Sequence, residues 1–143
     1  PEVWQIEDVQ VTCGTNVIPT AVVRLRNVET GELYTDAGFG TGPVDAVYAG
    51  INRLVGVPNR LVEFVIQAID QGMDAVGDVT IRIEADELIG FVERAQGGRG
   101  QRIFSGRGID TDIVVASAKA YLQALNKLLA AKDERESVVA LGV

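Results

Sequence analysis

Histidine is absent from this chain of 143 residues, and the other side chains that most often carry catalysis are scarce. Without histidine the chain cannot assemble a Ser-His-Asp triad, a Cys-His pair, a histidine general base or a histidine-containing metal site. The lysines are only Lys119, Lys127 and Lys132, spaced along an expected helix and its tail as solvated charges are. Carboxylate-only metal sites and lysine chemistry stay open, but a free-standing enzyme is the least favoured class.

Cysteine is almost as rare, because Cys13 is the only one and no internal disulfide can form. Cys13 lies in a stretch of alternating apolar residues, so we expect a small buried hydrophobic side chain. No stretch resembles a long apolar span or a signal sequence, and the net charge of −7 opposes binding to phosphate backbones and anionic lipid. We therefore expect a cytoplasmic protein with no nucleic-acid or membrane partner.

What the chain does contain is an internal repeat. Residues 4–26 align without a gap on residues 62–84, and residues 33–47 align on residues 103–117. Identities are few, but two alignments in the same order indicate a duplicated unit of about seventy residues. A unit of this size buries little apolar surface alone, so we expect the two copies to share one core.

The repeat predicts the domain organisation. We expect a single domain over residues 1–130, with repeats at about 4–57 and 61–129 and a flexible tail over 131–143. Each repeat is predicted to fold as three strands followed by a helix. The predicted fold is therefore α+β, with antiparallel sheets, helices packed on one side of them, and an internal pseudo-twofold axis.

Alternating and helical patterns place the elements. The first repeat predicts strands at 4–13, 20–26 and 33–37, with a bulge near Asp8, and the second predicts strands at about 61–70, 77–84 and 102–106. The first helix begins at Pro43 and is stopped by Gly56 and Pro58. The second helix, opened by Asp110-Thr111-Asp112, is expected to be about one turn longer.

Two features could bind a ligand. The strand-to-helix corners at 40–43 and 108–112 present backbone N–H groups at a positive helix end, which suits a small carboxylate, although glycine-rich tight turns also look like this. Neither a GxGxxG fingerprint nor a P-loop lysine is present, which disfavours nucleotide phosphate. The arginine-glycine segment at 97–102, with Arg107 behind it, could contact phosphate or RNA, but an acidic chain with few aromatics favours a solvated connection.

The two corners carry a resemblance to a known family. The segments at 34–47 (YTDAGFGTGPVDAV) and 104–126 (FSGRGIDTDIVVASAKAYLQALN) resemble the C-terminal regulatory domain of 2-isopropylmalate synthase. The resemblance runs from about Trp4 to Leu129. Citramalate synthase shares this domain, so the two enzymes are hard to separate at this level.

The resemblance implies a feedback sensor for a branched-chain amino acid that pairs as a homodimer, with two effector molecules at or near the pairing interface. In the family the sensor follows a TIM-barrel domain that holds a divalent metal ion and condenses acetyl-CoA with a 2-oxo acid. No catalysis and no cofactor are then expected in this chain. Matched onto this sequence, the effector site comprises Gly40, Thr41, Gly42, Val44, Asp45, Leu61, Phe64, Ala68, Ala75, Gly77, Asp110, Thr111 and Ile113.

The chemistry of these residues fits an amino acid. Helix N-termini donate N–H groups to a carboxylate, Asp45, Asp110 or Asp112 can accept from an ammonium, and Leu61, Phe64 and Ala68 can wall an apolar cavity. Small Ala68 leaves room for a γ-branched tip, which favours leucine over isoleucine. Two alternatives stay open: these apolar residues are plain core, or the module only dimerises.

Overall fold

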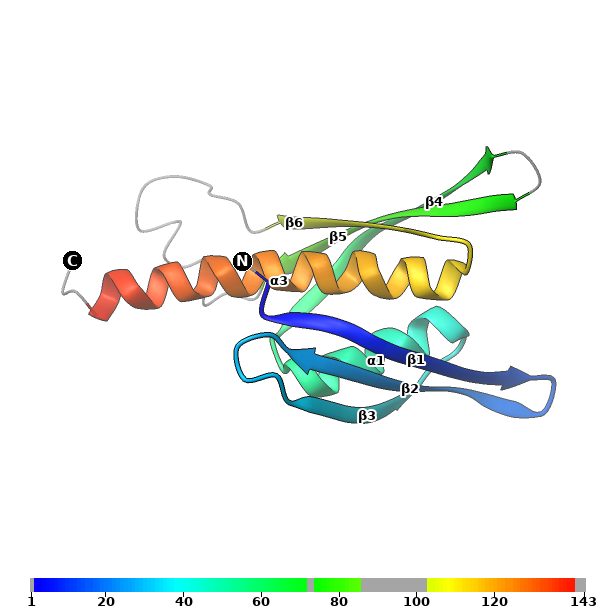
Figure 1. Cartoon of the computed structure of the whole chain (residues 1–143), viewed down its shortest axis with the longest axis horizontal. Helices are drawn as coiled ribbons and strands as arrows, with labels where there is room; N and C mark the ends of the chain where they lie inside the picture. Colours follow the sequence, from blue (N-terminus) through cyan, green and yellow to red (C-terminus); the bar gives the residue numbers. More distant parts are fainter. Residues whose placement is uncertain (1, 72–73, 86–102, 141–143) are drawn as a thin grey trace.

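The computed structural model describes residues 2–71, 74–85 and 103–140, which form two copies of one motif (Figure 1). The first copy comprises β1 (Trp4–Gly14), β2 (Val17–Asn27), β3 (Leu33–Phe39) and α1 (Pro43–Val55). The second comprises β4 (Asn59–Gln71), β5 (Asp74–Ala85), β6 (Ile103–Asp110) and α3 (Ile113–Ala140). The strands form two antiparallel sheets with orders β1-β2-β3 and β4-β5-β6. The predicted α+β fold, with one helix packed against each sheet, is confirmed.

The core lies between the sheets and the helices, as the alternating patterns predict. The central strands β2 and β5 are fully buried on their inner faces at Ala21, Val23, Leu25, Val79, Ile81 and Ile83. The two helices meet each other through Tyr48 of α1 and Tyr121 of α3, whose ring centroids are 4.3 Å apart. One core therefore serves both copies.

The strand pairing corrects part of the sequence alignment. The sequence alignment matches Leu25 to Ile83, which lies 58 residues later. In the sheets, Leu25 pairs with Ile6 and Ile83 pairs with Leu61, and these two partners are only 55 residues apart. A bulge follows each of these partners, so the two first strands correspond bulge to bulge. The ungapped alignment is therefore wrong by three residues in the first strand, because the hairpin formed by β4 and β5 is three residues longer than the one formed by β1 and β2. The predicted bulge near Asp8 is confirmed.

Several other predictions from sequence are wrong. The second helix has 28 residues against 13 in the first, so it is about four turns longer, not one. It runs on through Ala140, so the chain does not leave the helix near residue 130; the flexibility of the tail stays a prediction. Cys13 is exposed instead of buried, because the end of β1 extends beyond the helices. The arginine-glycine segment at 97–102 lies outside the described residues.

Both helices lie unusually close to a strand that carries glycine. A Cβ atom at Gly108 would lie 2.0 Å from the Ala116 carbonyl oxygen, and one at Gly106 would lie 1.9 Å from the Ala120 carbonyl oxygen. At the equivalent place in the first copy, a Cβ atom at Gly38 would lie 2.3 Å from the Gly50 amide nitrogen. No other residue type permits this separation, so each helix rests directly on the last strand of its sheet.

The close contacts at Gly108 predict that a larger side chain there lowers the free energy of unfolding. Gly108→Ala forces α3 away from β6, and we expect a loss of about 3 kcal/mol in the free energy of unfolding, measured with urea. Gly14→Ala is the matched control, because nothing lies within 4 Å of a Cβ atom there. Equal stabilities of the two variants would show that α3 does not depend on close packing against β6.

Candidate functional site

The predicted effector residues of the second copy share one face of its sheet. Ala68, Gly77 and Asp110 are successive partners across β4, β5 and β6, so they form one row. The Ile113 side chain covers this row, because a Cβ atom at Gly77 would lie 2.5 Å from its Cδ1 atom. Phe64 and Leu61 lie on the same inner face, opposite Ile81 and Ile83. Ala75 pairs with Asp70 toward the hairpin.

The inner face of β4 is left uncovered. It pairs with fully buried positions of β5, yet Leu61 is 42% exposed and Ile66 is 47% exposed. Ala68 is exposed as well, and Phe64 is half-buried. In the single chain Leu61, Ile66 and Ala68 are thus exposed, whereas Phe64 packs partly against the core. Ile66 completes this apolar strip, which we define as Leu61, Phe64, Ile66 and Ala68; the alternation of β4 could have revealed it.

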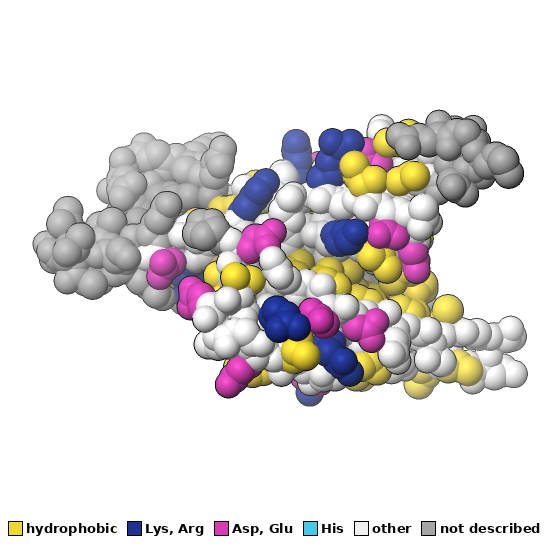
Figure 2. All heavy atoms as spheres, in the orientation of Figure 1, with side chains coloured by type: hydrophobic (Ala, Val, Ile, Leu, Met, Phe, Trp, Pro, Cys, Tyr) yellow, Lys and Arg dark blue, Asp and Glu magenta, His cyan; other side chains and the backbone are white. Residues whose placement is uncertain are grey.

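The strip runs along β4 toward the end of the molecule where the helices begin: Ala68 shares a row with Asp110, whereas Leu61 shares a row with Phe104 near the start of β6. Figure 1 shows α1 and α3 beginning at the same end of the molecule, where β3 and β6 finish. In the same view, hydrophobic side chains gather in the hollow between the two sheets at that end (Figure 2). The two strand-to-helix corners, far apart in the sequence, are thus brought to one end of the protein.

The first corner is occupied by one of its own carboxylates. Asp45 Oδ2 accepts a hydrogen bond of 2.8 Å from the Thr41 amide and lies 3.3 Å from the Thr41 hydroxyl oxygen. Gly40 lies beneath this carboxylate, since a Cβ atom there would be 2.3 Å from Asp45 Oδ2. Gly42 caps the helix with no side-chain hydrogen bond and has open space around it. Val44 points inward and is half-buried against the core.

The second corner is also occupied by its own carboxylates. Asp110 Oδ1 accepts a 2.9 Å hydrogen bond from the Asp112 amide, and Asp112 Oδ1 accepts a 2.8 Å hydrogen bond from the Val114 amide. The Asp112 amide and the Lys119 ammonium, 3.0 Å from Asp110 Oδ2, hold the pKa of Asp110 below its ordinary value. Gly108 to Asp110 belong to β6 and not to a loop, so the free corner is shorter than the sequence predicts.

Some helix N–H groups nevertheless stay free at each corner. In α1 the first intrahelical hydrogen bond runs from Ala46 N to Gly42 O, which leaves the Val44 and Asp45 amides for a ligand. In α3 it runs from Ala116 N to Asp112 O, which leaves the amides of residues 113 and 115. Each corner thus combines two free donors with a carboxylate, a pattern that suits a zwitterion.

One residue beside these corners was not predicted. Tyr48 of α1 lies one turn after Val44 and stacks on Tyr121, and its ring also makes an edge contact with Phe64 at 6.3 Å between centroids. Burial raises the pKa of Tyr48 far above its ordinary value. In the sequence, Tyr48 follows Val44 and Val47 and precedes Ile51 at the spacing of one apolar helix face, which indicates core and not function.

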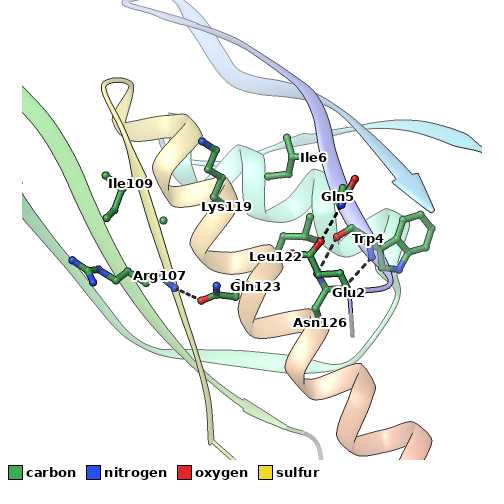
Figure 3. Close-up of a pocket in the computed structure, with 11 residues that line it drawn as sticks. Glu2, Trp4, Gln5, Ile6, Arg107, Ile109, Lys119, Leu122, Gln123 and Asn126 are labelled. Atoms are coloured by element: carbon green, nitrogen blue, oxygen red, sulfur yellow. Dashed lines mark hydrogen bonds between the residues drawn. The ribbon is translucent and has the colours of Figure 1, made fainter. Parts of the chain in front are cut away.

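A separate groove of about 420 Å³ lies on the other side of α3, between β1 and β6 (Figure 3). Two carboxamides of α3 hold the strands on its flanks. Asn126 binds the backbone of Val3 and Trp4 through three hydrogen bonds of 2.9 to 3.1 Å, and Gln123 accepts a 2.8 Å hydrogen bond from the Arg107 amide. The Arg107 guanidinium binds Asp78 Oδ1 at 2.8 Å, so its side chain turns away from this groove. None of the predicted site residues lines the groove.

No helix within 2–71, 74–85 and 103–140 combines the length and hydropathy that a membrane crossing requires. In that same part of the chain, no three Cys, Asp or Glu side chains converge as a metal site.

Comparison with known proteins decides the family. Residues 1–129 match the model of the LeuA allosteric (dimerisation) domain. The chain belongs to this family. It is 48% identical over 143 residues to a 2-isopropylmalate synthase of Nostoc, a match that covers 98% of this chain and 24% of that protein. Those of Gloeothece citriformis and Trichodesmium erythraeum are 49% and 51% identical, over 96% and 91% of this chain and 23% and 21% of theirs. The chain thus spans about a quarter of the length of these relatives.

The charge of Asp110 is expected to contribute to the stability of this LeuA-type domain in a pH-dependent way. Because the pKa of Asp110 is lower in the folded chain than in the unfolded one, its ionised form stabilises the fold above a pH of about 4, and this contribution is lost as the pH falls through the folded pKa. Asp110→Asn keeps an acceptor for the Asp112 amide and removes only the charge. We expect the variant to be less stable than the parent at pH 7, measured with urea, and the difference to shrink by pH 3.

Glu29→Gln is the control for this experiment, because Glu29 is an exposed carboxylate in the turn after β2. It should change stability little at either pH. A difference for Asp110→Asn that stays constant from pH 7 to pH 3 would contradict an electrostatic role.

Proposed function

We propose that this chain is the leucine-binding feedback and dimerisation domain of a 2-isopropylmalate synthase. The parent enzyme, on this proposal, condenses acetyl-CoA with 2-oxoisovalerate in a separate catalytic domain that uses a divalent metal, in the cytoplasm, and this chain carries no catalysis. Support comes from the family match and from relatives named 2-isopropylmalate synthase. The observation that carries the proposal is the exposed apolar strip of β4, which runs to the row of Asp110 at the end where both helices begin.

The strip and the corners together suit a zwitterion with an aliphatic side chain. The free helix amides donate to the effector carboxylate, as helix N-termini do for anions. Asp45 is the better acceptor for the ammonium, because its described partners are only the Thr41 amide and hydroxyl, whereas Asp110 already pairs with Lys119. The aliphatic side chain of the effector packs on the strip.

The strip also explains why the domain pairs. An exposed apolar surface flanked by polar corners is typical of a protein interface. We propose that a second copy covers the strip and closes the effector site, so that two effectors lie at the homodimer interface. The effector then favours one arrangement of the pair by virtue of its contacts with both copies.

The choice of leucine depends on the small residue in the strip. Ala68 is the strip residue in the row of Gly77 and Asp110, and it is exposed, which leaves space beside the second corner for a branched tip. Isoleucine branches at Cβ, next to its charged groups, whereas leucine branches one carbon further from them. Differences of this size in apolar pockets are worth roughly 1–3 kcal/mol, or about ten- to a hundredfold in affinity.

Calorimetric titration of this chain tests the proposal. We expect saturable heat with leucine, weaker binding of isoleucine by about tenfold, and no detectable heat with alanine or lysine. Sedimentation in the same buffer should show a dimer. A folded dimer that gives no heat with any branched-chain amino acid would refute the sensor function and leave a module that only dimerises.

A charge at Gly42 separates these two functions. Gly42 has an ordinary extended backbone and nothing within 4 Å of a Cβ atom, so Gly42→Asp is tolerated sterically. The added carboxylate repels that of the effector, and we expect leucine affinity to fall at least tenfold. Gly42→Asn, of equal size and no charge, should bind nearly as the parent does. Equal affinity of the Asp and Asn variants would mean that the effector carboxylate lies elsewhere.

A further inference from the structure

We propose that the Tyr48 hydroxyl is a hydrogen-bond donor reserved for the effector. The inference rests on the proposed function, because it names a residue of the same site that neither the sequence pattern nor the family resemblance identifies. Its basis is a buried hydroxyl that has no partner in the unliganded chain.

The Tyr48 hydroxyl is an exception among the buried side chains. Tyr48 is 8% exposed, and its Oη atom is buried with no hydrogen-bond partner among the described residues. The Ser117 hydroxyl, which donates to the Ile113 carbonyl oxygen at 2.7 Å, is near enough to act on the pKa of Tyr48 but does not meet hydrogen-bond geometry with it. A buried hydroxyl without a partner costs roughly 1–3 kcal/mol, so a protein that keeps one has a use for it or holds a water there.

Two neighbours of Tyr48, Val44 and Phe64, are predicted effector residues, and a third lies close to another. Val44 precedes it by one turn of α1, Phe64 contacts its ring, and Ser117 is one turn after Ile113 in α3. These neighbours come from three elements, α1, β4 and α3, which are the elements that supply the two corners and the apolar strip. The Tyr48 side chain therefore lies among the residues that the effector is proposed to touch.

Phe64 gives the effector a path to this hydroxyl. Phe64 is half-buried on the uncovered strand β4 and makes an edge contact with the Tyr48 ring. When an aliphatic side chain packs on the strip, the Phe64 ring turns, and the hydroxyl becomes a donor to the effector carboxylate. A hydrogen bond from a neutral hydroxyl to a charged group is stronger than one between neutral groups.

Tyr121 provides a matched control in the same cluster. Its ring stacks on Tyr48 and is equally buried, but its hydroxyl donates to Asn59 Oδ1 at 2.9 Å. Tyr48→Phe and Tyr121→Phe each remove one hydroxyl group, and the two rings are buried beside each other. Only the presence of a partner in the unliganded chain differs.

The test measures both stability and leucine affinity of Tyr48→Phe and Tyr121→Phe in the whole chain. Without leucine, Tyr48→Phe should raise the midpoint of thermal unfolding by about 3 °C, because it removes an unpaired polar group, and Tyr121→Phe should lower it by a similar amount. With leucine, Tyr48→Phe should weaken binding about tenfold, whereas Tyr121→Phe should bind within about twofold of the parent.

The outcomes separate this inference from the function on which it rests. If the parent chain binds leucine and Tyr48→Phe binds equally well, the hydroxyl serves only the fold or a buried water, and the inference is overturned alone. If the parent does not bind leucine, both proposals fail. Tyrosine difference absorption near 285 nm gives an independent readout: the leucine-induced change should vanish in Tyr48→Phe and persist in Tyr121→Phe.

Discussion

The close packing of α3 on β6 is the constraint from which the rest of the structure follows. Gly106 and Gly108 admit the backbone of α3 so closely that the helix is centred on β5 and β6. A helix in that position cannot also cover β4, whose inner face stays open at Leu61 and Ile66. The apolar strip is therefore a consequence of how the helix is seated. It is also the surface to which we assign the proposed partner and effector.

The electrostatics of the corners change the expected chemistry of recognition. The sequence suggests two bare helix N-termini that attract an anion, but Asp45, Asp110 and Asp112 already accept hydrogen bonds there. Only part of the positive helix end is left for a ligand carboxylate. The same aspartates make each corner suitable for an ammonium group. A ligand with both charges thus fits better than a simple carboxylate, which favours an amino acid over an acid without an ammonium group.

The repeated fold was predictable because its signals are local. Alternation in β2 and β5, Pro43 at the start of α1 and Gly56 at its end each act within a few residues. The three-residue shift in the first strand was missed, because it depends on the length of a hairpin and not on the pattern of either strand. The exposure of the strip and of Cys13 could not be inferred, since alternation shows which residues share a face but not what covers it. The Tyr48 hydroxyl was likewise invisible, because its lack of a partner depends on Ser117 and Phe64, which are distant in the sequence.

The most direct test of the central claim is an amide chemical-shift map of the ¹⁵N-labelled chain titrated with leucine. If the effector binds across the paired helix starts, the largest shifts fall on the free amides of Val44, Asp45, Ile113 and Val115, with smaller ones along β4. Shifts centred instead on Trp4, Arg107 and Gln123 would place the ligand in the groove on the far side of α3. That result would contradict an effector site built from the two corners and the strip.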